Sequence, residues 1–251
     1  MAWPILFLFG IAVGSFLNVL AVRYKDGGRI FSWDILTGRS RCPHCGKNLR
    51  WYELIPLVSF LIQGGKCRHC HALLNWQYPV VELISGLLFV FVPLHASPAW
   101  LWLLVALALL LLSLIDLRLY IIPDQIQLFL LSLGLASLIQ KGIGDLGVWQ
   151  SPLFGAFAGA AIFGFIVLLT KGRGMGLGDV KLAAVLGFLF GWPQIILITG
   201  LSFAVGGIFA MALLLMRRKN MKDVVPFGPF LAGAAILVLF CGNAILNLYG
   251  F

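Results

Sequence analysis

Charged residues are scarce in this sequence. Only 11% of its 251 residues are charged, and only nine are acidic. Soluble domains carry about 25% charged and about 45–50% apolar residues, whereas 61% of this chain is hydrophobic and its mean hydropathy is +1.01. The composition excludes an ordinary soluble domain and indicates a chain that lies mostly in a membrane.

The first hydrophobic run lacks the marks of a cleaved signal peptide. It opens MAWPILFLFG with no basic segment, and no A-x-A site closes it. We therefore expect it to be retained as the first membrane span.

Long apolar runs, by contrast, are abundant. A helix needs about 20 apolar residues to cross a hydrocarbon core about 30 Å thick. The predicted fold is therefore an all-α polytopic membrane protein with about eight transmembrane helices. The predicted spans are 3–22, 78–94, 100–115, 122–140, 152–170, 180–190, 193–216 and 228–248. The sixth is short, and its small residues favour close packing on neighbouring helices.

One polar segment interrupts these runs, so the chain divides into a first helix at 1–22, a lobe at 23–76 and a transmembrane core at 77–251. With the amino terminus outside, seventeen of the eighteen Lys and Arg residues lie on the inner side and only Lys141 lies outside. Lys and Arg favour the cytoplasmic side of membranes. This preference predicts a cytoplasmic lobe and makes a nucleic-acid partner unnecessary to explain the net charge of +9.

Two acids fall at the same predicted membrane face. Asp116 ends the third span, and Asp179 begins the sixth within GMGLGDVKL. Acids beside membrane spans are costly and usually functional. Two carboxylates in one site share a proton, and such a pair can activate a water molecule and protonate a departing amine. Gly174, Gly176 and Gly178 would let an extended substrate backbone approach.

Each acid also has a structural interpretation. Asp116 could pair with Arg118 or cap a helix end, and Asp179 could be the N-cap of the sixth helix, since Asp favours that position. Asp124 is best explained as a cap of the fourth helix. The pair at one depth is stronger evidence than either member alone.

The lobe contains Cys42-Pro-His-Cys45 and Cys67-Arg-His-Cys70. Two C-x2-C knuckles at this separation predict a structural four-thiolate zinc site, in preference to redox-active or free thiols. The nearby histidines His44, His69 and His71 could substitute as ligands, but exposed side chains explain them better. A closed four-sulfur site leaves no position for water, so we expect no hydrolysis there. Cys241 is isolated in the last span.

These residues together resemble the type IV prepilin peptidase family, also called prepilin leader peptidase/N-methyltransferase. The resemblance covers nearly the whole chain. Its motifs are GSFLNVLAVR at 14–23, SRCPHCGKNLRWYELIPLVSFLIQGGKCRHC at 40–70, YPVVE at 78–82, DLRLYIIPD at 116–124, GMGLGDVKLAAVLG at 174–187 and VPFGPFLAGAA at 225–235.

The resemblance implies an enzyme of the bacterial inner membrane that cuts the basic leader from type IV prepilins or type II secretion pseudopilins at the cytoplasmic face. Asp116 and Asp179 then match the family's catalytic aspartates, and Cys42, Cys45, Cys67 and Cys70 match its cysteines. It also implies N-methylation of the new amino terminus with S-adenosylmethionine, an assignment that rests on analogy. No Rossmann fingerprint marks the methyl-donor site, so its residues stay unassigned.

Three alternatives remain open from the residues. A monofunctional peptidase would use the lobe only to recognise substrate. A transporter with an aspartate ion relay would place its acids near mid-membrane and carry inverted repeats, neither of which is evident. A membrane-tethered zinc module that only binds partners would not need the two aspartates.

Overall fold

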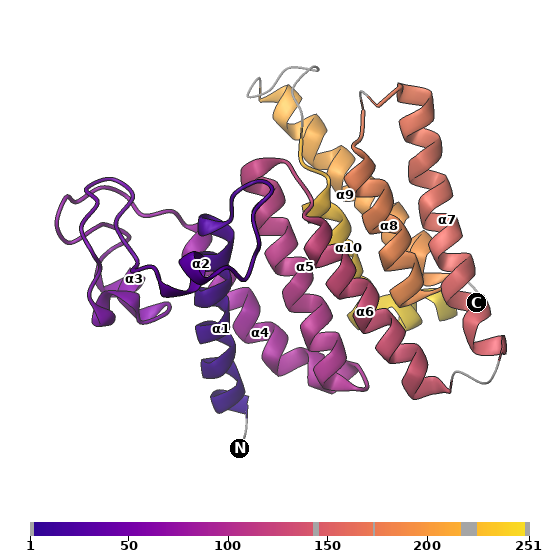
Figure 1. Ribbon diagram of the computed structural model, residues 1–251, viewed down its shortest axis with the longest axis horizontal. Helices are drawn as coiled ribbons and strands as arrows, with labels where there is room; N and C mark the ends of the chain where they lie inside the picture. Colours follow the sequence, from indigo (N-terminus) through magenta and orange to yellow (C-terminus); the bar gives the residue numbers. More distant parts are fainter. Residues whose placement is uncertain (1–2, 143–145, 173, 217–224, 249–251) are drawn as a thin grey trace. The chain divides into compact units, whose positions relative to one another are not determined.

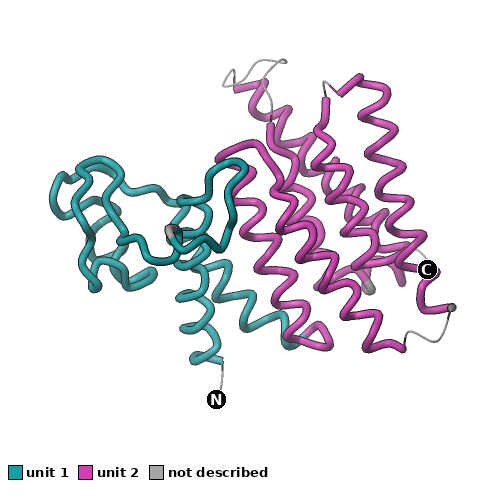
Figure 2. Tube along the Cα trace, in the orientation of Figure 1, with its two compact units in different colours: residues 1–94 teal, residues 95–251 magenta. Residues whose placement is uncertain are grey.

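The computed structural model describes residues 3–142, 146–172, 174–216 and 225–248. In this part of the chain the regular elements are α-helices and one short 3-10 helix, with two isolated β-bridges. The predicted all-helical fold is confirmed. The chain forms two compact units, residues 1–94 and 95–251 (Figure 2).

The first unit is built on two long helices with the polar lobe between them. Its elements are α1 (Trp3–Arg23), α2 (Trp33–Thr37), η1 (Trp51–Leu54), α3 (Val58–Ile62) and α4 (Gln77–His95). The last residue of α4, His95, is counted with the second unit. Glycines let α1 approach α4 closely, since a Cβ added at Gly14 would lie 2.7 Å from Cβ of Ser85. This contact fixes the two helices that flank the lobe.

The described residues of the second unit form a bundle of six helices. They are α5 (Ala99–Leu119), α6 (Asp124–Lys141), α7 (Leu146–Thr170), α8 (Leu177–Phe190), α9 (Gln194–Leu215) and α10 (Gly228–Leu248). Within this unit α8 lies between α6 and α7, and α10 packs against both α5 and α9 (Figure 1). The centre is mostly apolar, with Leu109, Ile115 and Leu186 all completely buried.

The short helix α8 is held by backbone-to-backbone packing on α7. A Cβ at Gly155 or at Gly187 would collide with the backbone of the other glycine, and a Cβ at Gly159 would collide with Ala183. Small residues permit such close approach of helix backbones. The predicted tight packing of the sixth apolar segment is therefore confirmed.

Each predicted span coincides with a helix, although the ends differ. Helix α7 begins six residues before the predicted start, so Pro152 lies inside it. Helix α5 extends past its predicted end and includes Asp116. Among the described residues five helices are long and apolar enough to cross a membrane, namely α1, α4, α5, α7 and α9. Helix α8 is only 14 residues long, and α6 carries more polar residues.

Some basic residues used to orient the chain lie outside the described residues. They are Arg173, Arg217, Arg218, Lys219 and Lys222. Lys181 is described, and its Nζ pairs with Oδ1 of Asp124 at 2.9 Å.

Candidate active site and metal centre

Asp116 is a buried carboxylate in the last turn of α5. Its side chain is only 4% exposed. Its Oδ2 accepts a hydrogen bond from the backbone N–H of Gly228 at 2.9 Å. A buried carboxylate is costly without such a partner, so the first residue of α10 holds the acid in place.

An aromatic cluster positions the segment that carries this N–H group. The ring of Phe227 lies 5.8 Å from that of Phe163 and 5.2 Å from that of Phe203, between centroids. Phe163 is completely buried. Because Phe227 directly precedes Gly228, the packing of its ring fixes where the N–H group points.

Asp179 lies in the first turn of α8, ahead of that helix's apolar segment. The N-cap residue is Gly176, so Asp179 is not the N-cap but the third helical residue. Its Oδ2 accepts a hydrogen bond from the N–H of Gly176 at 3.2 Å. A negative charge is favoured at this end of a helix. Asp179 is half-buried, so it stays accessible.

The two acids belong to one electrostatic site. The end of α5 and the start of α8 lie at the same end of the second unit (Figure 1). The pKa of Asp179 is raised to about 6, mainly because the carboxyl is buried. The charge of Asp116 raises this pKa further, because it disfavours ionisation of Asp179, whereas the hydrogen bond from the Gly176 N–H lowers it. The structure therefore brings together the carboxylates that the sequence singled out.

Asp124 does not join this pair. It is the first residue of α6, after the N-cap residue Pro123, and the structure records no side-chain cap for that helix start. Its ion pair with Lys181 is largely exposed, with 67% and 58% of the two side chains accessible. An exposed ion pair contributes about 1 kcal/mol or less. Asp124 is thus a surface link between α6 and α8, not the side-chain cap that we expected.

Of the glycines before Asp179, only Gly176 borders its carboxylate, whereas a Cβ at Gly174 would lie 3.0 Å from Thr170 and a Cβ at Gly178 would lie 3.3 Å from Ile122. Gly174 and Gly176 are exposed, and neither they nor Gly178 adopt a positive φ. A Cβ at Gly176 would lie 3.7 Å from Oδ2 of Asp179. Their contribution is therefore missing bulk, not unusual backbone geometry.

The four cysteines of the lobe converge. The Sγ atoms of Cys42, Cys45, Cys67 and Cys70 all lie within 4.8 Å of one another, and those of Cys42 and Cys70 are 3.8 Å apart. A tetrahedral site with Zn–S bonds of about 2.3 Å separates its sulfurs by about 3.8 Å. The cluster could hold a metal ion, and its donor set fits zinc.

The two knuckles have the same backbone geometry. In each knuckle, the residue just before the first cysteine forms an isolated β-bridge with the residue seven positions later. These pairs are Arg41 with Asn48 and Lys66 with Leu73. The position after each second cysteine is left-handed, with φ of 69° at Gly46 and 57° at His71. This duplication indicates two equivalent halves of one metal centre.

Backbone amides favour the thiolate form of Cys67. The N–H groups of Cys70 and His69 lower the pKa of the Cys67 thiol to about 7. Thiolates are the form that binds metal. The three neighbouring histidines are exposed and lie outside the sulfur cluster.

Reasoning from sequence missed two kinds of site residue. One is Gly228, whose N–H holds Asp116; the signal was the VPFGPF motif, but no side chain there suggested a contact. The other is the pair Glu53 and Glu82, both buried at 6% exposure. Buried acids line a cavity of the first unit, together with residues from α1 and from the first cysteine knuckle.

Two family models match the chain. The bacterial peptidase A24 N-terminal domain matches residues 8–96, and the type IV leader peptidase family matches residues 103–211. No solved structure matches.

Related sequences align over nearly the whole chain. A protein of Aeromonas salmonicida named prepilin leader peptidase/N-methyltransferase is 36% identical over 279 residues, covering 98% of this chain and 93% of its own length. A protein of the same name from Pseudomonas aeruginosa is 36% identical, covering 96% of this chain and 91% of its own length. Another, from Bacillus subtilis, is 33% identical, covering 98% of this chain and 96% of its own length. With five long apolar helices among its described residues, the chain is a multi-pass membrane protein, and it belongs to the type IV leader peptidase family.

Proposed function

We propose that the protein is an aspartyl endopeptidase that removes the leader of type IV prepilins or type II secretion pseudopilins and then methylates the new amino terminus. The observation that carries the peptidase half is the electrostatic coupling of Asp179 to the buried Asp116. The names of the relatives support the substrate class and both activities.

The chemistry follows from two carboxyl groups that share one proton. The ionised carboxylate takes a proton from water, and the resulting hydroxide attacks the scissile carbonyl carbon. The protonated carboxyl gives its proton to the departing amine as the C–N bond breaks. No covalent intermediate with the enzyme is formed. Burial and the charge of Asp116 support this assignment, because they raise the pKa of Asp179 to about 6, closer to neutral pH than that of an ordinary aspartate.

We place the reaction at the cytoplasmic face of the inner membrane, with the amino terminus of the enzyme outside. The excess of Lys and Arg in the predicted inner segments supports this orientation. A prepilin carries a basic leader before an apolar helix, so its scissile bond lies near the membrane surface. Carboxylates at the end of a helical bundle meet that bond without drawing polar peptide into lipid.

The cysteine cluster would hold structural zinc. Four sulfur ligands leave no open coordination position, so the metal orders the lobe and takes no part in hydrolysis. Each of the three segments predicted from the sequence then has its own role. Residues 1–22 anchor the chain in the membrane, residues 23–76 form the zinc lobe and residues 77–251 form the peptidase core.

Methyl transfer requires S-adenosylmethionine, which supplies a methyl group activated on a sulfonium sulfur. The chain's part is to bind this donor and to present the free amine of the cleaved substrate to it. The family's combined name supports this second activity.

The test is incubation of the purified protein with a model prepilin, followed by mass spectrometry of the product's amino terminus. We expect leader removal by the wild type and none by Asp116→Asn or Asp179→Asn, with all three inserted in membranes to the same extent. Continued cleavage by either variant would refute the aspartyl mechanism. Cleavage without methylation in the presence of S-adenosylmethionine would leave a monofunctional peptidase.

A further inference from the structure

The polar lobe of the first unit contains one long stretch without charge. Nine of the eighteen Lys and Arg residues lie within residues 23–76, yet none of the twelve residues between Glu53 and Lys66 is charged. This stretch, LIPLVSFLIQGG at residues 54–65, contains α3 and is called the apolar segment below. Its composition differs from that of the surrounding lobe and resembles that of a membrane-facing element.

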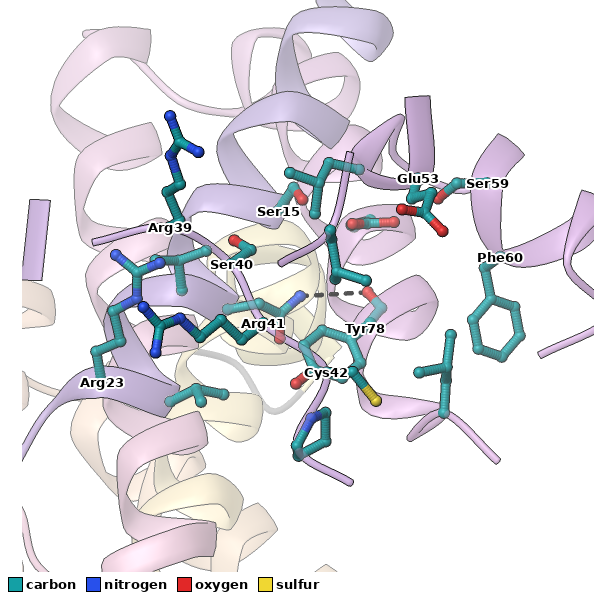
Figure 3. A pocket seen from close by; sticks show the side chains of 18 residues that line it. Ser15, Arg23, Arg39, Ser40, Arg41, Cys42, Glu53, Ser59, Phe60 and Tyr78 are labelled. Atoms are coloured by element: carbon teal, nitrogen blue, oxygen red, sulfur yellow. Dashed lines mark hydrogen bonds between the residues drawn. The ribbon is translucent and has the colours of Figure 1, made fainter. Parts of the chain in front are cut away.

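Helix α3 has one covered and one uncovered face. Phe60 is buried, and together with Ser59 it lines the cavity of the first unit (Figure 3). The next two residues, Leu61 and Ile62, are 75% and 70% exposed. The described residues therefore leave two large apolar side chains of α3 uncovered. Contiguous exposed apolar surface of this kind marks a contact with a protein or a membrane.

A hydrogen bond places the start of α3 beside the first turns of α4. Oε2 of the buried Glu82 accepts it from the backbone N–H of Leu57, the N-cap residue of α3, at 2.8 Å. Glu82 stands five residues after Gln77, where α4 begins, which corresponds to about 7.5 Å along the helix axis. The start of α3 is thus level with the second turn of α4 and does not lie beyond the end of that helix.

An aromatic contact connects α3 to the residue that precedes α4. The rings of Phe60 and Trp76 meet edge to face, with their centroids 5.1 Å apart. Trp76 directly precedes α4 and is 70% exposed. Trp side chains are enriched where membrane helices meet water. Helix α3 therefore contacts a residue of the type that occupies the membrane–water interface.

The length of α4 indicates where that interface lies. Helix α4 is one of the helices long and apolar enough to cross a membrane. Its 19 residues extend about 28 Å, whereas the hydrocarbon core is about 30 Å thick. The whole of α4 is needed for a crossing, so Gln77 lies at the edge of the core and Glu82 lies inside it. Amphipathic helices at membrane surfaces bury their apolar faces to a similar depth, about 5–10 Å.

The backbone turns sharply on both sides of α3. Leu57 has a φ of 60°, which is uncommon for a residue other than glycine, and the bond from its N–H to Glu82 holds this conformation. After α3, Gly64 and Gly65 have φ values of 59° and 67° and lead the chain back to Lys66. The apolar segment is therefore a short excursion that begins and ends in the charged part of the lobe.

We propose that the apolar segment inserts into the leaflet in which α1 ends and α4 begins, with Leu61 and Ile62 among the lipid acyl chains. Lipid is the favoured occupant because the segment adjoins a membrane helix along the turns that lie within the hydrocarbon core. Arg50 and Lys66 flank the segment, are exposed, and can reach the phosphates of lipid headgroups. The lobe is then held at the membrane surface by this insertion as well as by α1 and α4. The inference rests on the membrane-spanning fold and not on the proposed function.

The experiment places the photoreactive residue p-benzoylphenylalanine at position 61 of the full chain, in vesicles of phosphatidylethanolamine and phosphatidylglycerol. The larger side chain needs no room inside the fold, because Leu61 is exposed. The matched control carries the same residue in place of Lys47, an exposed position in the first cysteine knuckle. After irradiation, mass spectrometry of the digested protein measures the lipid adducts. We expect at least about ten times more lipid adduct at position 61 than at position 47, as for a side chain among acyl chains compared with one in water.

Equal yields at the two positions, or no lipid adduct at position 61, would overturn the proposal. Cross-links from position 61 to a second copy of the chain would instead make the segment an oligomer contact. Cross-links that form only with added prepilin would make it a substrate contact. Either result would also refute insertion into lipid. Thermal unfolding equal to that of the wild type establishes that the labelled proteins are folded.

Limited proteolysis in lipid nanodiscs, where both membrane faces are accessible, gives an independent measurement. Ile62→Asp places a charge where we expect acyl chains, and charge is costly there. Cleavage between residues 54 and 65 should therefore be several times faster in Ile62→Asp than in the wild type. Lys47→Asp changes the charge of the lobe outside the segment and should leave this rate unchanged. Equal rates for the wild type and Ile62→Asp would show that the segment is not inserted.

Discussion

The N–H of Gly228 donates to Oδ2 of Asp116 at 2.9 Å, across 112 residues of sequence. The contact joins the end of α5 to the start of α10. It depends on the absence of a side chain at Gly228, since a Cβ there would lie 2.6 Å from the same oxygen. The position of the buried Asp116 carboxylate thus depends on a glycine that contributes no side chain.

Gly228→Ala should therefore impair leader cleavage. The added methyl group pushes the Asp116 carboxylate away from its hydrogen-bond donor, and a displacement of about 1 Å can cost on the order of 100-fold in rate. The matched control is Gly233→Ala in the same helix, where an added Cβ meets nothing within 4 Å. Initial rates of prepilin cleavage provide the measurement. Equal rates for the two variants would show that the Asp116–Gly228 contact has no catalytic importance.

Asp116→Asn should lower the pKa of Asp179. The charge of Asp116 is the second cause of the raised pKa of about 6, after burial. Removing it favours the ionised form of Asp179, so the pKa falls but stays above the ordinary value because burial remains. Infrared titration of the carboxyl stretch, with isotope-labelled aspartate, follows the change. Asp124→Asn, which removes only an exposed ion pair, should leave the titration of Asp179 unchanged.

The helices could be predicted from sequence because each span has a continuous apolar run, and lipid demands such runs. The pairing of Asp116 with Asp179 could be predicted because charge bias placed both at one face. The residue at which α5 ends could not be predicted. The helix continues past Ile115, because its backbone hydrogen bonding extends beyond the end of the apolar run. Helix boundaries are set by local caps that hydropathy does not register.

The cavity of the first unit could not be predicted from spacing. Glu53 and Glu82 stand 29 residues apart in sequence, one in a 3-10 turn and one in a long helix. In contrast, the four cysteines were recognisable because a metal site of this kind has a fixed local repeat. Tertiary packing brings the two acids together, and no local pattern records it.

Removal of one cysteine ligand should release the metal and disorder the lobe. Cys42→Ser replaces a buried sulfur of the cluster, so we expect loss of bound zinc and faster proteolysis between residues 23 and 76, because structural zinc contributes directly to folding. Metal analysis by mass spectrometry and limited proteolysis report the two effects. Cys241→Ser, at an exposed position outside the cluster, should retain the metal. Full zinc content in Cys42→Ser would exclude Cys42 as a ligand.

Packing between α7 and α8 should tolerate no added bulk at the crossing point. Gly155→Val would drive a side chain into the backbone of Gly187, whereas Gly164→Val in the same helix meets open space. Both substitutions change helix propensity equally, so the difference between them reports the collision alone. Overpacking typically costs about 1–3 kcal/mol, and a clash with backbone cannot be relieved by rotating a side chain.

We expect a lower Tm for Gly155→Val in detergent, together with slower leader cleavage, because α8 carries Asp179 in its first turn. Unfolding of both variants at the same temperature would show that the glycine contact does not hold α8 in place.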